Sequence, residues 1–221
     1  MDRLPFSPYD FFGYLASGLL LVVGMDLIFG FPPVLGRNFT VVESAILLLV
    51  VYVAGQMIAT PAKAFLEDLL VARILRRPNI NLLERKKPWL RGLIFPGYYQ
   101  PLSEQAQKRV LTRAESEGIK GIGEDLFLHV RYNPQVLENV KLMDRMNGFL
   151  NQYGLHRNLS FTALLLGAAL LLKFKLSSEV NPELAKYAAA SLGAGVLLFY
   201  RYLKFFRQYS YELFNTYGRA E

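Results

Sequence analysis

Asp125 and His129 are the two residues whose types and spacing come nearest to acid–base or metal chemistry. They stand four positions apart, so on a helix they share one face. A metal site needs at least one further good ligand, and the other histidine, His156, is 27 positions away. The chain has no cysteine, which removes thiolate ligands, disulfides and a cysteine nucleophile. The sequence therefore predicts no metal site and no cofactor.

Gly118, Gly121 and Gly123 are close enough together to raise the question of a phosphate-binding loop. No strand pattern precedes them and no Gly-Lys-Ser/Thr follows, so the requirements of such a loop are not met. Gly-x-Ser-x-Gly is also missing. We predict that the protein is not an enzyme and has no catalytic residues. The open alternative is a lipid-modifying enzyme that uses Asp125, His129 or Asp26.

Asp26 is the one charged residue in the apolar stretch from Phe11 to Phe31. A carboxylate at the centre of a membrane-spanning helix costs about 2.5–3.5 kcal/mol, and less near the interface. Two interpretations fit. Asp26 lines a pore or proton path, or it lies at interfacial depth and pairs with Arg37 or Lys186.

Two further polar residues belong to the second apolar stretch and complete the set of pore candidates. Glu43 stands in its first turn, where the helix dipole favours an acid. Gln56 lies in the middle of it. It either lines a pore or forms a hydrogen bond to a neighbouring helix.

Small residues recur every four positions in two apolar stretches. Gly13 and Ser17 do so in the first, and Ala185, Ala189 and Gly193 do so in the last. Such spacing lets helix backbones approach closely in lipid, where there is no hydrophobic drive to associate. The contacts are either within one chain or between copies, which would make the protein a homo-oligomer.

A basic and aromatic patch lies in the middle of the chain, formed by Arg85, Lys86, Lys87, Trp89 and Arg91. This mixture suits single-stranded nucleic acid or another anionic ligand. It also suits anionic headgroups, where Trp anchors at the interface and each basic residue adds about 1 kcal/mol. Because long apolar stretches flank the patch, we favour membrane lipid over nucleic acid as the partner.

The apolar stretches must position these residues, and two of them predict transmembrane helices. Apolar residues make up 52% of the 221 positions and charged residues 19%. The first span runs from Phe11 to Phe31 and stops at Pro32-Pro33, and the second runs from Val41 to Thr60. Helical periodicity then continues beyond Pro61 to Arg77. Residues 1–60 thus hold the first two spans.

Two shorter stretches predict a transmembrane hairpin over residues 158–206, followed by a tail over 207–221. Asn158 to Leu172 and Tyr187 to Tyr200 are uncharged. Asn181-Pro182-Glu183 has a cap, a proline and an acid in the order that starts a helix. The alternative is that this pair lies in the interface or re-enters the membrane.

The intervening residues, 61–157, predict a helical domain. Ser103 caps a helix from Glu104 to Glu117, and a short helix follows over Glu124 to Tyr132. Asn133-Pro134 begins another helix, which we expect to stop at Gly154. Asn79 to Pro101 reads as irregular. The predicted fold class is all-α, with four transmembrane helices and a helical cytoplasmic insert between the second and third.

Orientation follows from the basic residues, which collect on the cytoplasmic side of membrane proteins. With four spans and a cytoplasmic N-terminus, 21 of the 25 Lys and Arg residues fall on that side. The net charge of +7 fits the same arrangement. Both termini are expected to be cytoplasmic.

Ser7-Pro8-Tyr9-Asp10-Phe11-Phe12-Gly13-Tyr14-Leu15 and Arg157-Asn158-Leu159-Ser160 resemble motifs of a group of uncharacterised bacterial inner-membrane proteins. Similar four-span proteins serve as membrane subunits of anti-phage systems such as Kiwa. The resemblance implies a multi-pass protein of the bacterial inner membrane and a role in antiviral defence. It carries over no catalytic residue.

The leading functional hypothesis is a non-catalytic membrane sensor or effector. We expect it to be oligomeric and to couple a cytoplasmic protein partner or ligand to its membrane helices. The alternative is a structural subunit that anchors other proteins in a larger membrane complex.

Overall fold

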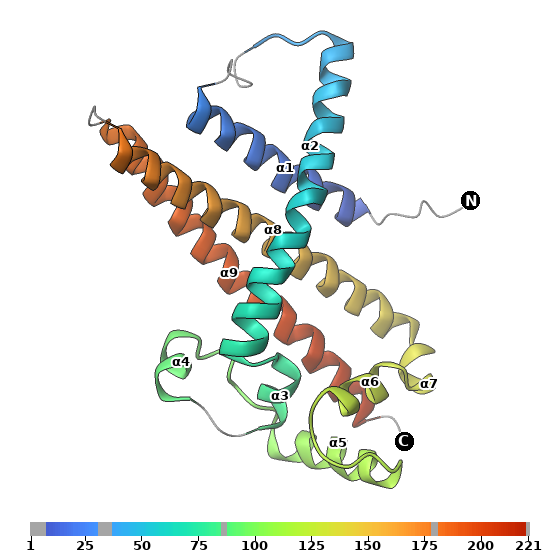
Figure 1. The fold of residues 1–221 in the computed structure, drawn as a ribbon. Coiled ribbons are helices and arrows are strands. Elements are labelled where there is room, and N and C mark those ends of the chain that lie inside the picture. The colour runs from blue at the N-terminus through green and yellow to red at the C-terminus, as the bar shows by residue number, and fades with distance from the viewer. Residues whose placement is uncertain (1–7, 31–36, 85–87, 178–180, 220–221) are drawn as a thin grey trace. The chain divides into compact units, whose positions relative to one another are not determined.

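The computed structural model describes residues 8–30, 37–84, 88–177 and 181–219, and all regular structure in these ranges is helical (Figure 1). The predicted all-α class is therefore confirmed for the described residues. The chain divides into two compact units. The first comprises residues 1–69 and 154–202, and the second comprises residues 70–153 and 203–221.

Helix α1 (Pro8–Phe29) and helix α2 (Val41–Ala62) open the first unit. α1 ends because Gly30 takes a left-handed conformation with φ +69°, and its N–H donates to the Asp26 carbonyl at 2.8 Å. The prediction that the helix stops at Pro32-Pro33 falls outside the described residues. α2 begins with a capping box in which Thr40 and Glu43 bond each other's backbone N–H.

Beyond Pro61 the second helix changes type and continues as a π-helix, η1 (Lys63–Leu75). Proline has no N–H to donate to the preceding turn, and the Lys63 N–H is shared between the carbonyls of Ala59 and Thr60. The predicted continuation toward Arg77 is confirmed, as a wider helix. It ends at Arg76, whose φ is +64°.

Helix α8 (Val140–Leu176) and helix α9 (Pro182–Tyr217) contribute residues to both units. α9 begins at the predicted Asn181-Pro182-Glu183, where the Asn181 side chain accepts from the Glu183 N–H at 3.0 Å. The expectation that a helix stops at Gly154 was wrong, because α8 runs through Gly154 without a break. A helix gains more from packing its apolar face than a single glycine costs.

The first unit packs by close approach of helix backbones. A methyl group at Gly18 would overlap the Val51 carbonyl oxygen, and one at Gly55 would overlap the Tyr14 carbonyl oxygen. Only glycine allows α1 and α2 to pass this closely. Lys173 donates to the Ile28 carbonyl at 2.7 Å, so α8 supplies a cation to the C-terminal end of α1.

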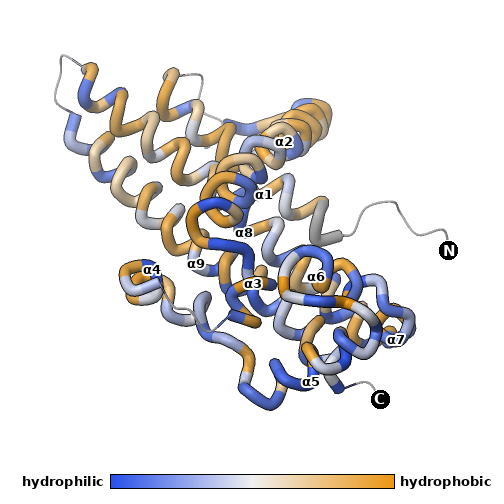
Figure 2. The backbone as a smooth tube through the Cα atoms, turned by 60° about the horizontal axis from the view of Figure 1, so that its bottom comes forward, coloured by the Kyte–Doolittle hydropathy of each residue, from blue (hydrophilic) through white to orange (hydrophobic). Residues whose placement is uncertain are grey.

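Within the described ranges, three helical stretches are long and apolar enough to cross a membrane: Phe11–Phe29, Val41–Leu83 and Val140–Leu176. They indicate a multi-pass membrane protein. Figure 2 colours the backbone by hydropathy: α2 is mostly hydrophobic, whereas α5 is mostly hydrophilic. The predicted third span lies inside α8. The predicted fourth, Tyr187 to Tyr200, lies in α9 between Lys186 and Arg201 and is not among the three.

The second unit folds around its own hydrophobic core. It contains α3 (Pro78–Leu83), α4 (Trp89–Ile94), α5 (Glu104–Ser116), α6 (Glu124–Arg131) and α7 (Pro134–Leu137), with parts of η1, α8 and α9. Val110 of α5, Val130 of α6 and Phe214 of α9 are fully buried together in this core. Large apolar side chains that leave water hold this unit together.

Two local predictions for this unit were wrong. The segment Asn79 to Pro101, expected to be irregular, contains α3 and α4, because Pro78 and Pro88 each stand at the start of a short helix. The helix that begins at Pro134 ends at Leu137. Asn139 then caps α8, its side chain accepting from the Leu142 N–H at 3.0 Å.

Candidate functional site

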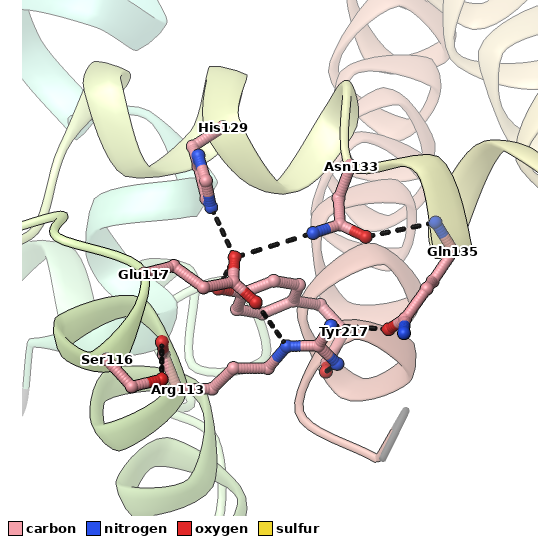
Figure 3. Close-up of polar contacts among 7 residues, drawn as sticks. All are labelled: Arg113, Ser116, Glu117, His129, Asn133, Gln135 and Tyr217. Carbon is pink, nitrogen blue, oxygen red and sulfur yellow. Dashed lines mark hydrogen bonds and ion pairs between the residues drawn. The ribbon is translucent and has the colours of Figure 1, made fainter.

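Glu117 is the centre of a polar cluster in the second unit, and four helices meet there. It is the C-terminal cap residue of α5, and its position follows from Gly118, whose φ of +84° ends that helix. His129 comes from the last turn of α6 and Asn133 caps α7. Tyr217 is the last residue of α9. Figure 3 shows their side chains converging on the carboxylate.

Each oxygen of the Glu117 carboxylate has a defined partner. Oε1 accepts from Arg113 Nε at 2.8 Å. Oε2 lies 2.6 Å from His129 Nε2 and accepts from the Tyr217 hydroxyl at 2.9 Å. The Asn133 amide lies at 3.4 Å from the same oxygen. This carboxylate therefore links α5 to α6, α7 and α9.

Arg113 gives the cluster its second connection to α9. Its Nη1 donates to the Tyr217 carbonyl at 2.8 Å, and its guanidinium lies 4.5 Å from the centre of the Tyr217 ring. Nη2 donates to the Gln135 side chain on α7. One arginine thus satisfies a carbonyl at the end of α9 and stacks on its final aromatic ring.

The surroundings fix the charge of this carboxylate. Burial by itself raises the pKa of Glu117, but hydrogen bonds from Arg113, His129 and Tyr217 outweigh it and lower that pKa to about 2. Burial and the hydrogen bond to Glu117 raise the pKa of Tyr217. Glu117 is therefore ionised and Tyr217 is a neutral donor at physiological pH.

A shallow groove of about 770 Å³ lies beside the cluster, along one face of α5. Lys108 and Arg109 are both exposed on it, and the structure shows no ion pair for either among the residues that it describes. Thr112 and Ser116 add hydroxyl groups. The charge of Glu117 is already matched by Arg113, so the groove carries net positive charge and is suited to an anionic group.

The side chains of the cluster are engaged with one another and with the backbone. The Ser116 hydroxyl beside the cluster donates to the Arg113 carbonyl at 2.7 Å. Over the described residues there is no group of three or more His, Asp or Glu that could hold a metal ion. The arrangement is suited to joining helices and to presenting a cationic groove.

In comparisons with protein-family models, with curated proteins and with solved structures, no match was found.

Asp26, Arg37 and Lys186 all lie in the first unit, but the two cations form ion pairs with other carboxylates. Arg37 binds Glu43 at 2.9 Å and Lys186 binds Glu183 at 2.7 Å, so neither serves Asp26. Asp26 itself is half-buried. Among the described residues, each of these cations is paired with a carboxylate much nearer in sequence.

Glu43 and Gln56 both bond within their own stretch of chain. Glu43 completes the capping box with Thr40, and the Gln56 amide donates to the Tyr52 hydroxyl one turn earlier at 3.0 Å. Gln56 is exposed on the surface of the unit. Neither contact joins two helices.

The small residues divide into buried and exposed sets. Gly13 and Ser17 are buried, and the Ser17 hydroxyl donates to the Gly13 carbonyl at 3.0 Å. On α9, Ala189 and Gly193 are exposed and Ala185 is half-buried. The backbone at Gly193 has open space around it. The strip Ala185, Ala189 and Gly193 is therefore not the one that packs α9 against α8.

A neighbouring strip on α9 makes the contact with α8 instead. The Ser160 hydroxyl donates to the Gly195 carbonyl at 2.8 Å, and the Ser191 hydroxyl donates to the Ala163 carbonyl at 2.8 Å. A methyl group at Gly195 would lie 2.7 Å from Leu164 Cγ. Hydrogen bonds through small residues thus hold this pair of helices together.

The basic and aromatic patch is described in part. Arg85, Lys86 and Lys87 lie outside the described residues. Trp89 and Arg91 belong to α4, where Trp89 is 86% exposed and Arg91 donates to the Ile74 carbonyl at the end of η1.

Sequence reasoning missed the Glu117 cluster and the two glycines, Gly18 and Gly55, at the crossing of α1 and α2. Arg113 and Glu117 stand at i and i+4 on a helix that was predicted, so their pairing could have been found. Tyr217 lies 100 positions from Glu117, and no local signal connects them. Gly18 has no small residue four positions away, whereas Gly55 has Ala59, so the sequence carried a signal for the second glycine but none for the first.

Proposed function

We propose that this chain is a non-catalytic sensor or effector of the bacterial inner membrane. In this proposal the second unit is cytoplasmic and receives a soluble partner or ligand at the groove on α5. Binding there changes the membrane helices through α9. A fourth span in α9, cytoplasmic termini and a role in anti-phage defence complete the proposal, the last because of the resemblance of its motifs.

One observation carries the proposal: α9 is built into both units by different means. Its C-terminal end is buried in the core of the second unit at Leu213, Phe214 and Tyr217, and the Glu117 cluster holds it there. Its N-terminal half packs on α8 through Ser191 and Gly195 in the first unit. A ligand that shifts Arg113 or Glu117 acts directly on the end of this helix.

The exposed strip of Ala185, Ala189 and Gly193 supports the oligomeric part of the proposal. These residues are small and are not used in packing α9 against α8. In lipid, such a strip allows a helix from a second copy to approach closely. The number of copies follows from the mass of the detergent-solubilised protein.

The test compares the effect of the wild-type chain on bacterial cells with that of a groove variant. We expect expression of the wild type to change membrane potential, permeability or phage sensitivity. The double variant Lys108→Glu, Arg109→Glu reverses the charge of the groove, and we expect it to lose the effect while reaching the same level in the membrane. Lys120→Glu, on an exposed residue outside the groove, is the matched control.

Two results would count against the proposal. If the wild type leaves all three properties unchanged, there is no effector activity to explain. If the double variant behaves like the wild type, the groove does not receive the signal. Co-purification with fixed, stoichiometric partners in unstressed cells would favour the alternative, an anchoring subunit of a larger complex.

A further inference from the structure

Helix α4 presents an apolar face that none of the described residues of the second unit covers. Trp89 is 86% exposed, Leu93 74% and Leu90 59%, and no residue of this helix is buried. The rest of the second unit buries its large apolar side chains in one core. Three adjacent exposed residues of this size on one short helix are unusual on a surface that faces water.

The helix is nevertheless held in a fixed position by polar bonds. Arg91 donates to the Ile74 carbonyl, and the Tyr98 and Tyr99 hydroxyls donate to the Arg76 and Leu75 carbonyls at 2.7 and 2.8 Å. Both tyrosines are buried. These donors satisfy the last carbonyls of η1, so α4 is tied to the end of that helix.

That end cannot lie far from a membrane surface if α2 crosses the bilayer. The 34 residues from Val41 to Ile74 extend no further than about 51 Å at 1.5 Å per residue. A bilayer with its headgroups is about 40–45 Å thick. With Val41 at the opposite surface, Ile74 and the helix bonded to it lie within about two helical turns of the headgroups.

Composition also favours lipid over protein as the occupant. A helix that binds in a protein groove uses anchors over about eight residues, and α4 has six. Trp and Leu beside Arg91 are the residues that insert at the boundary between acyl chains and anionic headgroups.

We propose that α4 is a membrane-docking helix, whose Trp89, Leu90 and Leu93 insert into the cytoplasmic leaflet while Arg91 stays at headgroup level. This contact is independent of the groove on α5 and of any ligand there. It fixes the end of η1 against the bilayer from which the same helix emerges.

Trp89 is the single tryptophan of the chain, so the intrinsic fluorescence of the full-length protein reports on this helix alone. The protein is reconstituted into nanodiscs of phosphatidylcholine and phosphatidylglycerol, with and without brominated acyl chains. We expect blue-shifted emission, protection from acrylamide and about two-fold quenching by the brominated lipid. Emission typical of water with full acrylamide quenching would overturn the proposal. So would protection without bromine quenching, because protein would then cover the face.

Two variants make the result specific. Leu93→Glu places a charge on the exposed face without touching the core, and we expect it to abolish bromine quenching of Trp89. Leu137→Glu, at a residue 44% exposed in the same unit, is the matched control and should leave quenching unchanged. In the double variant Trp89→Phe, Leu137→Trp the moved indole should stay accessible to acrylamide. Equal loss of quenching in both glutamate variants would contradict the assignment to α4.

Discussion

The two units of this chain are held together by opposite kinds of side chain. In the first, the closest contacts are made where a side chain is missing, at Gly18, Gly55 and Gly195. In the second, the centre is filled by Val110, Val130, Phe214 and other large residues. Apolar side chains gain nothing by leaving lipid for protein, whereas they gain about 25 cal/mol per Å² by leaving water. Close backbone packing is the interaction that is effective in lipid, and burial of large apolar side chains is the one that is effective in water.

Polar groups are used differently as well. In the first unit, serine hydroxyls bond backbone carbonyls of the neighbouring helix, as Ser160 does at Gly195. In the second, an ionised carboxylate, Glu117, collects donors from residues far apart in sequence. Burying a net charge costs much free energy inside lipid, and it costs less where water reaches part of the cluster.

Because the chain has no cysteine, a single introduced thiol can report on the opening of each unit separately. Ala114 is buried in the second unit, and Ser17 and Ala188 are buried in the first. The variants Ala114→Cys, Ser17→Cys and Ala188→Cys therefore serve as reporters, read as rates of thiol labelling in detergent or nanodiscs.

The largest expected effect is in the core of the second unit. Phe214→Ala should destabilise that unit by about 3–5 kcal/mol, since it removes a fully buried ring and leaves a cavity. Labelling of the Ala114→Cys reporter should rise steeply, while labelling of Ser17→Cys should not change. Leu137→Ala, at an exposed residue, is the control. Equal opening of both reporters would show that the units unfold as one.

The next largest effect is expected in the first unit, where adding a side chain, rather than removing one, should destabilise the protein. Gly55→Val should destabilise the crossing of α1 and α2 by about 1–3 kcal/mol or more, because the new side chain overlaps the Tyr14 carbonyl. Gly154→Val makes the same change within α8, where an added methyl group meets nothing within 4 Å, and is the matched control. Labelling of Ser17→Cys should increase in the first variant alone.

A smaller effect is expected from the polar cluster, and it depends on pH. The pKa of Glu117 is lowered from 4.5 to about 2, so its contribution to stability is complete above about pH 4.5 and is lost as the pH falls toward 2. Glu117→Gln should cost about 1 kcal/mol at neutral pH, because the site is partly exposed.

That variant should also flatten the acid limb of the stability curve, as followed by the loss of helical circular dichroism on heating between pH 5 and about 2. Glu115→Gln, on an exposed residue two positions earlier, provides the comparison. An unchanged pH dependence in Glu117→Gln would show that this carboxylate does not control the acid response.

The smallest effect should come from a single hydrogen bond in the first unit. Ser160→Ala removes the bond to the Gly195 carbonyl and should cost about 0.6 kcal/mol, the average for such bonds between membrane helices. Labelling of Ala188→Cys should rise slightly. A loss of several kcal/mol would mean that polar bonds, rather than close backbone packing, hold α8 and α9 together.

The local elements could be read from the sequence with good accuracy. Ser103 and Gly118 bound α5, and Asn181-Pro182 begins α9, because capping depends on neighbouring residues alone. The continuity of α8 through Gly154 could not be read in this way, since packing outweighs the local cost of glycine. Pro61 marks where the helix is disturbed, but the sequence does not show that it continues as a π-helix.

The sequence by itself determined that the chain is helical and that long stretches of it suit a bilayer. Length, hydropathy and the lack of charge need no knowledge of neighbours. The tertiary structure decided which small residues pack, which carboxylate collects the donors, and that Trp89 faces outward from α4. These facts depend on residues brought together from distant positions, and sequence spacing carries no record of such distances.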